Sequence, residues 1–91
     1  MNKKVIFEYE IDYEKARQEA EKLAREIVQE HPHLKYKIIT WQGDGVYIEL
    51  YGDDEDLVWG ISQSLAQKKV RLLISGTPVY IIYGGKKKVA A

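Results

Sequence analysis

Cysteine is absent from this sequence of 91 residues, which excludes disulfide bonds, thiolate metal sites and cysteine nucleophiles. Long hydrophobic runs are also missing, because no stretch approaches the ~20 apolar residues that a membrane-spanning helix needs. No signal peptide is recognisable, since Met1–Lys4 leads directly into an alternating segment that contains Glu8 and Glu10. We therefore expect a soluble protein, cytoplasmic if it is expressed in a bacterial host, with no natural compartment identified.

An excess of charge of either sign is missing too. Fourteen basic and fourteen acidic residues balance, so no overall field attracts nucleic acid or anionic membranes. We expect neither as a partner. The content of 45% hydrophobic and 31% charged residues is typical of a folded protein, and the length is that of one domain. We predict a single α/β domain over residues 1–84 and a C-terminal tail over residues 85–91.

The most regular stretch of the chain, Asp12–Glu30, predicts an amphipathic helix. Asp12 can cap its start, and Pro32 disfavours helical geometry in the residue before it, so the helix should end near His31. One stripe at three- and four-residue spacing is apolar and should face the core. That stripe is Ala16, Ala20, Leu23 and Ile27.

Alternation of apolar and polar residues predicts strands at Lys3–Ile11, Leu34–Gln42 and Val46–Tyr51. Between the last two, Gly43–Gly45 suits a three-residue hairpin loop that pairs Gln42 with Val46. The core face would then carry Leu34, Tyr36, Ile38, Val46, Ile48 and Leu50.

A two-residue hairpin loop is the alternative, and it would turn Trp41 and Ile39 toward the core instead. We prefer the three-residue loop because it leaves Lys35 and Lys37 in water.

A second helix should begin at the acidic run Asp53–Asp56 and continue to about Lys69. In it, Gly60 and Ser64 lie four residues apart on one flank, where they should approach Ala20 and Ala24 of the first helix or border a small-ligand cleft. Trp59 points away from the predicted core stripe and has no assigned role.

The chain should end in a second hairpin. Val70–Ile74 is predicted to be a fourth strand, Ser75–Pro78 a turn and Val79–Tyr83 a fifth strand.

This order predicts an α+β protein with a ferredoxin-like split β-α-β fold (βαββαβ) plus a C-terminal fifth strand. The antiparallel sheet should have the first strand between the third and the fourth. Both helices should lie on one face, that of Phe7, Ile48 and Leu72.

The helix sequence DYEKARQEAEKLARE over residues 12–26, the alternating strands and the short turns rich in Gly and Asp carry a resemblance. Over residues 3–75 the chain resembles de novo designed ferredoxin-like α/β proteins. Trp59, Gly60, the Gln- and Ser-rich second helix and the added hairpin depart from that pattern. The resemblance implies an idealised structural scaffold without a natural biochemical function.

Candidate chemical sites are few. His31 and His33 have no third ligand near them in sequence, and the acidic run Asp53–Asp56 is explained by its place at a helix start. The serines lack the context of an activated nucleophile. We therefore predict no catalytic residue, no metal site and no cofactor.

A second hypothesis is that the outer face of the sheet mediates self-association or binding, as in a homodimer. The predicted interface residues are Ile6, Leu73, Tyr80, Ile82, Trp41 and Tyr47. Glu8, Glu10 and Glu49 on the same face oppose RNA binding and must find partners or stay solvated. A third hypothesis is a small-molecule binder with a cavity between helices and sheet, its ligand unknown.

Overall fold

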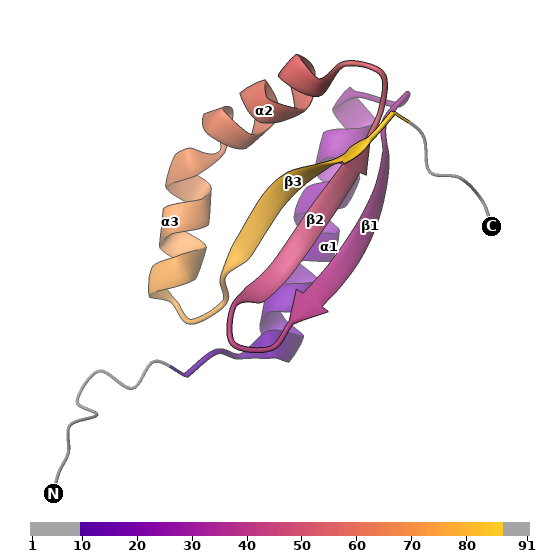
Figure 1. Cartoon of the computed structure of the whole chain (residues 1–91). Helices are drawn as coiled ribbons and strands as arrows, with labels where there is room; N and C mark the ends of the chain where they lie inside the picture. The colour runs from indigo at the N-terminus through magenta and orange to yellow at the C-terminus, as the bar shows by residue number, and fades with distance from the viewer. Residues whose placement is uncertain (1–9, 87–91) are drawn as a thin grey trace, which may run out of the picture.

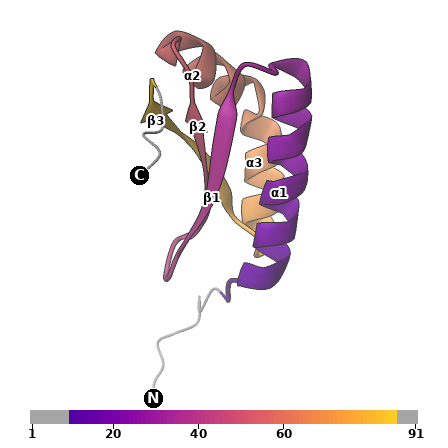
Figure 2. The ribbon, with the colours of Figure 1, turned by 90° about the vertical axis from the view of Figure 1, so that its right-hand side faces the viewer.

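The computed structural model describes residues 10–86, which form an α+β domain with a three-stranded mixed sheet (Figure 1). Strand β2 is central, antiparallel to β1 and parallel to β3. Seen edge-on, the sheet carries α1 and α3 on the same side (Figure 2). The elements in chain order are α1 (Tyr13–Glu30), β1 (Lys35–Trp41), β2 (Gly45–Tyr51), α2 (Glu55–Ser64), α3 (Ala66–Ile74) and β3 (Val79–Gly85).

The predicted ferredoxin-like, five-stranded antiparallel sheet is wrong. Val70–Ile74, predicted as a fourth strand, belongs to α3, so Val79–Tyr83 has no hairpin partner and pairs in parallel with β2 instead. A run of five residues that is mostly apolar does not distinguish a strand from a helix turn, and here the helix-favouring residues before it, Ala66–Lys69, extend the helical geometry.

The first predicted strand lies largely outside the described residues. Of Lys3–Ile11, only Glu10 and Ile11 are described, and neither is in a strand. At the other end, β3 continues through Gly85, the first residue of the predicted tail, and residues 87–91 lie outside the description.

The long helix is confirmed. The Asp12 carboxylate accepts a hydrogen bond from the Lys15 N–H at 3.0 Å, and the His31 N–H closes the last turn on the Ile27 carbonyl at 2.9 Å. The predicted stripe is buried, together with one further alanine. Its members are Ala16, Ala20, Leu23, Ala24 and Ile27.

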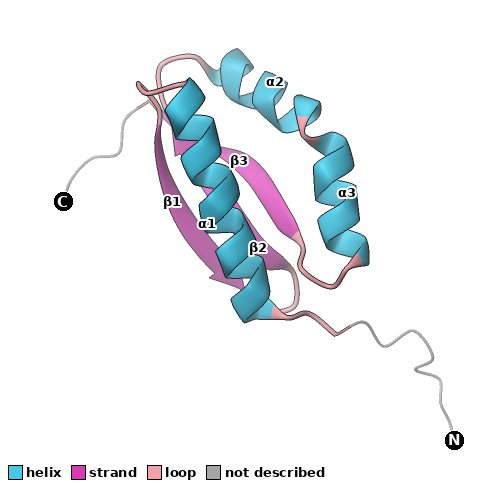
Figure 3. Cartoon of the chain, turned by 180° about the vertical axis from the view of Figure 1, so that it is seen from behind, coloured by secondary structure: helices cyan, strands magenta, loops and turns pink. Residues whose placement is uncertain are grey.

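The predicted second helix is two helices. Helix α2 ends at Ser64, Leu65 has the backbone angles φ −102° and ψ 15°, and α3 begins at Ala66. The Ser64 hydroxyl donates to the Ile61 carbonyl at 2.8 Å, a side-chain bond to the preceding turn that competes with the helical ladder. Figure 3 shows the change of direction between α2 and α3.

The predicted β1–β2 register is wrong by two residues. Val46 pairs with Thr40 rather than Gln42, and the loop is Gln42–Asp44 because Gly43 adopts the positive φ of +91°. A shift of two keeps every side chain on its predicted face. Leu34, Val46, Ile48 and Leu50 are therefore buried as predicted.

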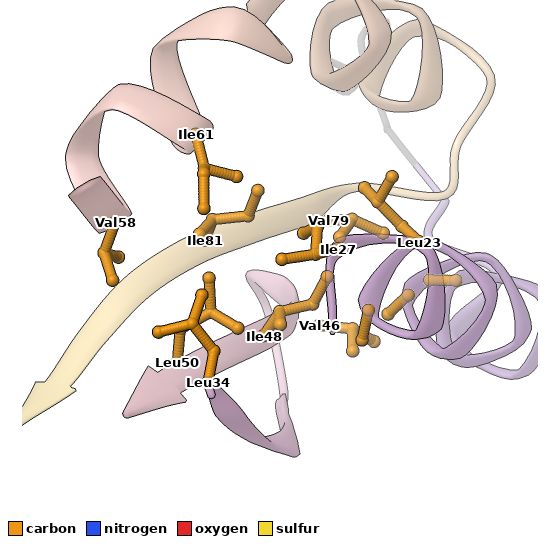
Figure 4. Packing of buried hydrophobic residues seen from close by; sticks show 13 residues of the cluster. Leu23, Ile27, Leu34, Val46, Ile48, Leu50, Val58, Ile61, Val79 and Ile81 are labelled. Carbon is orange, nitrogen blue, oxygen red and sulfur yellow. The ribbon is translucent and has the colours of Figure 1, made fainter. Parts of the chain in front are cut away.

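The core lies between the sheet and the helices (Figure 4). Leu23 and Ile27 of α1 cover one side of it, while Val58 and Ile61 of α2 lie over Ile81 of β3. Leu72 is half-buried against this core from α3 rather than from a strand, and Phe7 lies outside the described residues. The buried cluster is Ala16, Ala20, Leu23, Ala24, Ile27, Leu34, Val46, Ile48, Leu50, Val58, Ile61, Val79 and Ile81.

Trp59 and Gly60, which have no role in the core, both lie on the exposed side of α2. The Trp59 indole N–H donates to the Glu55 carboxylate one turn earlier, at 2.9 Å. Gly60 is exposed, and a Cβ added to it would meet nothing within 4 Å. The predicted close approach of Gly60 to α1 is therefore wrong.

Replacing Leu23 tests the buried stripe of α1. Leu23→Ala should lower the free energy of unfolding by about 2–5 kcal/mol, because it removes a buried side chain and leaves a cavity. Lys22→Ala, one position away on the exposed side, should change it by less than about 0.5 kcal/mol. Urea denaturation of both variants measures the difference, and equal midpoints would contradict the assigned face.

Replacing Gly60 tests its open position. Gly60→Ala should raise the free energy of unfolding by about 0.5–1 kcal/mol, because alanine restricts the unfolded chain and meets no obstacle in the helix. Gly45→Ala should do the opposite, since Gly45 has φ +143° and its added Cβ would lie 2.8 Å from Pro78. Thermal unfolding checks both signs; a destabilised Gly60→Ala would show that α2 is packed at that flank.

Candidate functional site

The side of the sheet away from the helices, here called the outer face, is the candidate site. No helix or strand within residues 10–86 covers it (Figure 2). Alternate residues of the three strands supply its side chains, because successive side chains of a strand point to opposite faces. They are Lys35, Lys37, Ile39 and Trp41 of β1, Tyr47, Glu49 and Tyr51 of β2, and Tyr80 and Ile82 of β3.

The end of this face near the β1–β2 loop is aromatic. Tyr47 and Tyr80 are register partners on neighbouring strands, with ring centroids 4.9 Å apart. Both hydroxyls reach Asp44 in the loop, Tyr47 to the carboxylate at 3.5 Å and Tyr80 to the backbone carbonyl at 3.4 Å. Burial, and then the charge of Asp44, raise the pKa of Tyr47. Beside this pair, Trp41 is 56% exposed.

Four of the six predicted interface residues lie together on the outer face: Trp41, Tyr47, Tyr80 and Ile82. Leu73 does not, because it belongs to α3, and its predicted place on a strand is wrong. Ile6 lies outside the described residues. The prediction missed Ile39, the register partner of Tyr47, although the same alternation pointed it outward.

The other end of the outer face is polar but partnered. The Tyr51 hydroxyl donates to the Glu49 carboxylate, so Glu49 finds its partner on its own strand. The Tyr51 ring lies against the backbone of Gly84, where a Cβ would come within 2.6 Å of the ring. Tyr51 is therefore only 7% exposed. The hydrogen bond from Tyr51 to the anionic Glu49, and then burial, raise the pKa of Tyr51 to about 12.

A half-open hollow of about 820 Å³ adjoins this polar end. Its volume is in the range of small-molecule sites, roughly 300–1,000 Å³. Three lysines and one aspartate are among its lining residues. The lining residues are His33, Lys35, Tyr36, Lys37, Tyr51, Gly52, Asp53 and Lys86.

The hollow between α1 and α2, where the small-ligand hypothesis placed a cleft beside Ser64, is about 170 Å³ and lies below that range. The rings of His31 and His33 are 6.3 Å apart, edge to face. The described part of the chain contains no group of three or more His, Cys, Asp or Glu residues able to hold a metal. Among its helices, none is both long and apolar enough to cross a bilayer.

One hydroxyl–amine pair escaped the sequence analysis. The Lys69 ammonium donates to the Ser62 hydroxyl at 2.6 Å, and burial lowers the pKa of Lys69. A serine beside a lysine can form a nucleophile and base. Ser62, however, is 9% exposed, and neither residue lines the hollows described above. The pair therefore connects α2 to α3 without an opening for a substrate.

Titration of tyrosine tests the bond between Tyr51 and Glu49. A raised pKa in the folded state means that this contribution to stability is complete below pH 10 and is lost as the pH rises from the ordinary value of 10.0 to about 12. Glu49→Gln should bring the titration of Tyr51 back toward 10 and remove this pH dependence.

The measurement is the absorbance of tyrosinate against pH, with Glu14→Gln, an exposed carboxylate on α1, as the control. A titration curve that Glu49→Gln leaves unchanged would contradict the bond.

No family model matches the chain, and no curated protein or solved structure shows significant similarity to it.

Proposed function

We propose that this chain is a non-catalytic, scaffold-like module whose outer face associates with a second copy of itself. The observation that carries the proposal is an uncovered sheet face, within residues 10–86, on which Trp41, Tyr47 and Tyr80 form a contiguous aromatic patch with Ile39 and Ile82. Contiguous apolar patches on a protein surface commonly mark contact sites. Aromatic side chains are the ones most enriched at such contacts.

The charge balance favours a second copy as the partner. The net charge is zero, so two copies do not repel each other at long range, and a net charge near zero promotes association. A two-fold axis through the aromatic patch would bury it against its own copy. Glu49 no longer opposes this arrangement, because Tyr51 already donates a hydrogen bond to it.

The Ser62–Lys69 pair supports the non-catalytic part of the proposal. It brings a hydroxyl and an amine together, yet Ser62 is buried between α2 and α3 and neither residue lines the hollows described above.

Light-scattering mass across a concentration series tests the association. The parent should rise from monomer to dimer mass below millimolar concentration, and Trp41→Lys should lower the dimer fraction by placing a charge in the contact. Val70→Lys is the matched control. The exposed fraction of Val70, 52%, is similar to the 56% of Trp41, but Val70 lies on α3 rather than on the outer face.

A parent that stays monomeric at hundreds of micromolar refutes self-association. A dimer that Trp41→Lys leaves intact places the contact elsewhere on the molecule.

A further inference from the structure

Strand β3 is paired along one side only, within residues 10–86. The Val46 N–H donates to the Pro78 carbonyl at 3.1 Å, so the backbone groups of Pro78 face β2. Because these groups alternate in direction along a strand, those of Val79, Ile81 and Tyr83 point away from β2. This side of β3 is here called the outer edge.

Helix α3 lies beyond the outer edge. Figures 1 and 3 show α3 displaced past β3 on the side away from β2, and Figure 2 shows it on the same side of the sheet as α1. None of its nine residues is buried, and Val70 and Ile74, one turn apart, are 52% and 76% exposed. The helix thus extends over a strip where the described sheet has no strand beneath it.

The start of the described chain leads to the same place. The Asp12 N–H donates to the Gly76 carbonyl at 2.8 Å, which holds the residues before α1 beside the loop that enters β3. Nine residues precede Glu10, and in extended form they span about 30 Å at ~3.3 Å per residue. That exceeds the length of the seven-residue β3.

We propose that the outer edge of β3 is a strand-acceptor site and that its occupant is the segment Lys3–Tyr9 of the same chain, bound antiparallel to β3 as a fourth strand. The tether at Asp12 favours this occupant over any free strand, because it makes the pairing intramolecular. The proposal concerns the sheet edge and does not depend on association through the outer face.

The contact between Asp12 and Gly76 brings the residues before α1 to the start of β3, and side-chain alternation sets the register. The apolar residues of the segment share the face of the buried Val79 and Ile81 when Phe7 is opposite Ile81, Tyr9 opposite Val79 and Val5 opposite Tyr83. The three β3 residues are those whose backbone groups point outward, so each pair exchanges hydrogen bonds.

Side-chain chemistry agrees with this register. Opposite residues of an antiparallel pair share a face, so Phe7 would join the buried Ile81 on the side of α2 and α3. The alternate residues Lys4, Ile6 and Glu8 would point to the outer face, with Ile6 beside Ile82.

Nuclear magnetic resonance of the full chain tests the pairing. The expected result is close Hα–Hα contacts between Glu8 and Tyr80 and between Ile6 and Ile82, the closely spaced pairs of this register. Mixing isotope-labelled with unlabelled chains separates contacts within one molecule from contacts between molecules. Absence of these contacts, or contacts only between molecules, overturns the proposal.

A pair of proline variants adds a matched comparison. Phe7→Pro removes an N–H that would donate to β3, whereas Glu8→Pro removes one that points away. The slow amide exchange expected for Ile81 and Tyr83 should be lost in Phe7→Pro and retained in Glu8→Pro.

Equal exchange in the two proline variants contradicts the pairing. If Phe7→Pro does not fold, the presence or absence of the Hα–Hα contacts in the parent still supports or overturns the pairing. A parent that is monomeric and shows these contacts refutes self-association while supporting the fourth strand.

Discussion

The parallel pairing of β3 with β2 is the constraint on which the rest of the structure depends. Two parallel neighbours cannot be joined by a tight turn, so the chain between them must cross over the sheet, and α2 and α3 form that crossover. The crossover places these helices on the face that α1 already covers, so Val46, Ile48 and Leu50 of β2 are fully buried. Within residues 10–86, the opposite face of the sheet is consequently covered by no helix or strand.

Different contacts hold the side chains at the two ends of the outer face. At the loop end, Asp44 receives both tyrosine hydroxyls, so the aromatic rings are aligned by the same turn that joins β1 and β2. At the polar end, Tyr51 packs on Gly84 and donates to Glu49, so that the Tyr51 ring is buried and Glu49 is half-buried. Trp41, the exposed large apolar side chain of the outer face, therefore lies at the opposite end from this bonded pair.

The sequence predicted correctly those features that depend on residues close together in the chain. The cap follows from the side chain of Asp12, and the α1 stripe and the faces of the β1 and β2 side chains follow from periods of 3.6 and 2. All of these are found. The prediction of a strand at Val70–Ile74 is wrong because five residues are too few to distinguish the period of a strand from that of a helix. The predicted partner of β3 is wrong as a consequence, since the pairing of β3 with β2 depends on contacts distant in sequence. In the candidate site, the predicted position of Leu73 on a strand is wrong for the same reason, because Leu73 belongs to α3. Trp41, Tyr47, Tyr80 and Ile82 lie on the predicted face of the sheet.

The distance along the chain between β2 and β3 has a consequence for biosynthesis. Helix α1 and the β1–β2 hairpin use contacts close in sequence, so they can form while the polypeptide is still emerging from a ribosome. The parallel ladder needs Val79–Gly85, which is separated from β2 by α2 and α3, and closing so long a connection carries an entropic cost. During translation the edge of β2 that β3 later covers is therefore exposed until Val79–Gly85 has left the ribosome, and a chaperone or a neighbouring nascent chain can reach it in that interval.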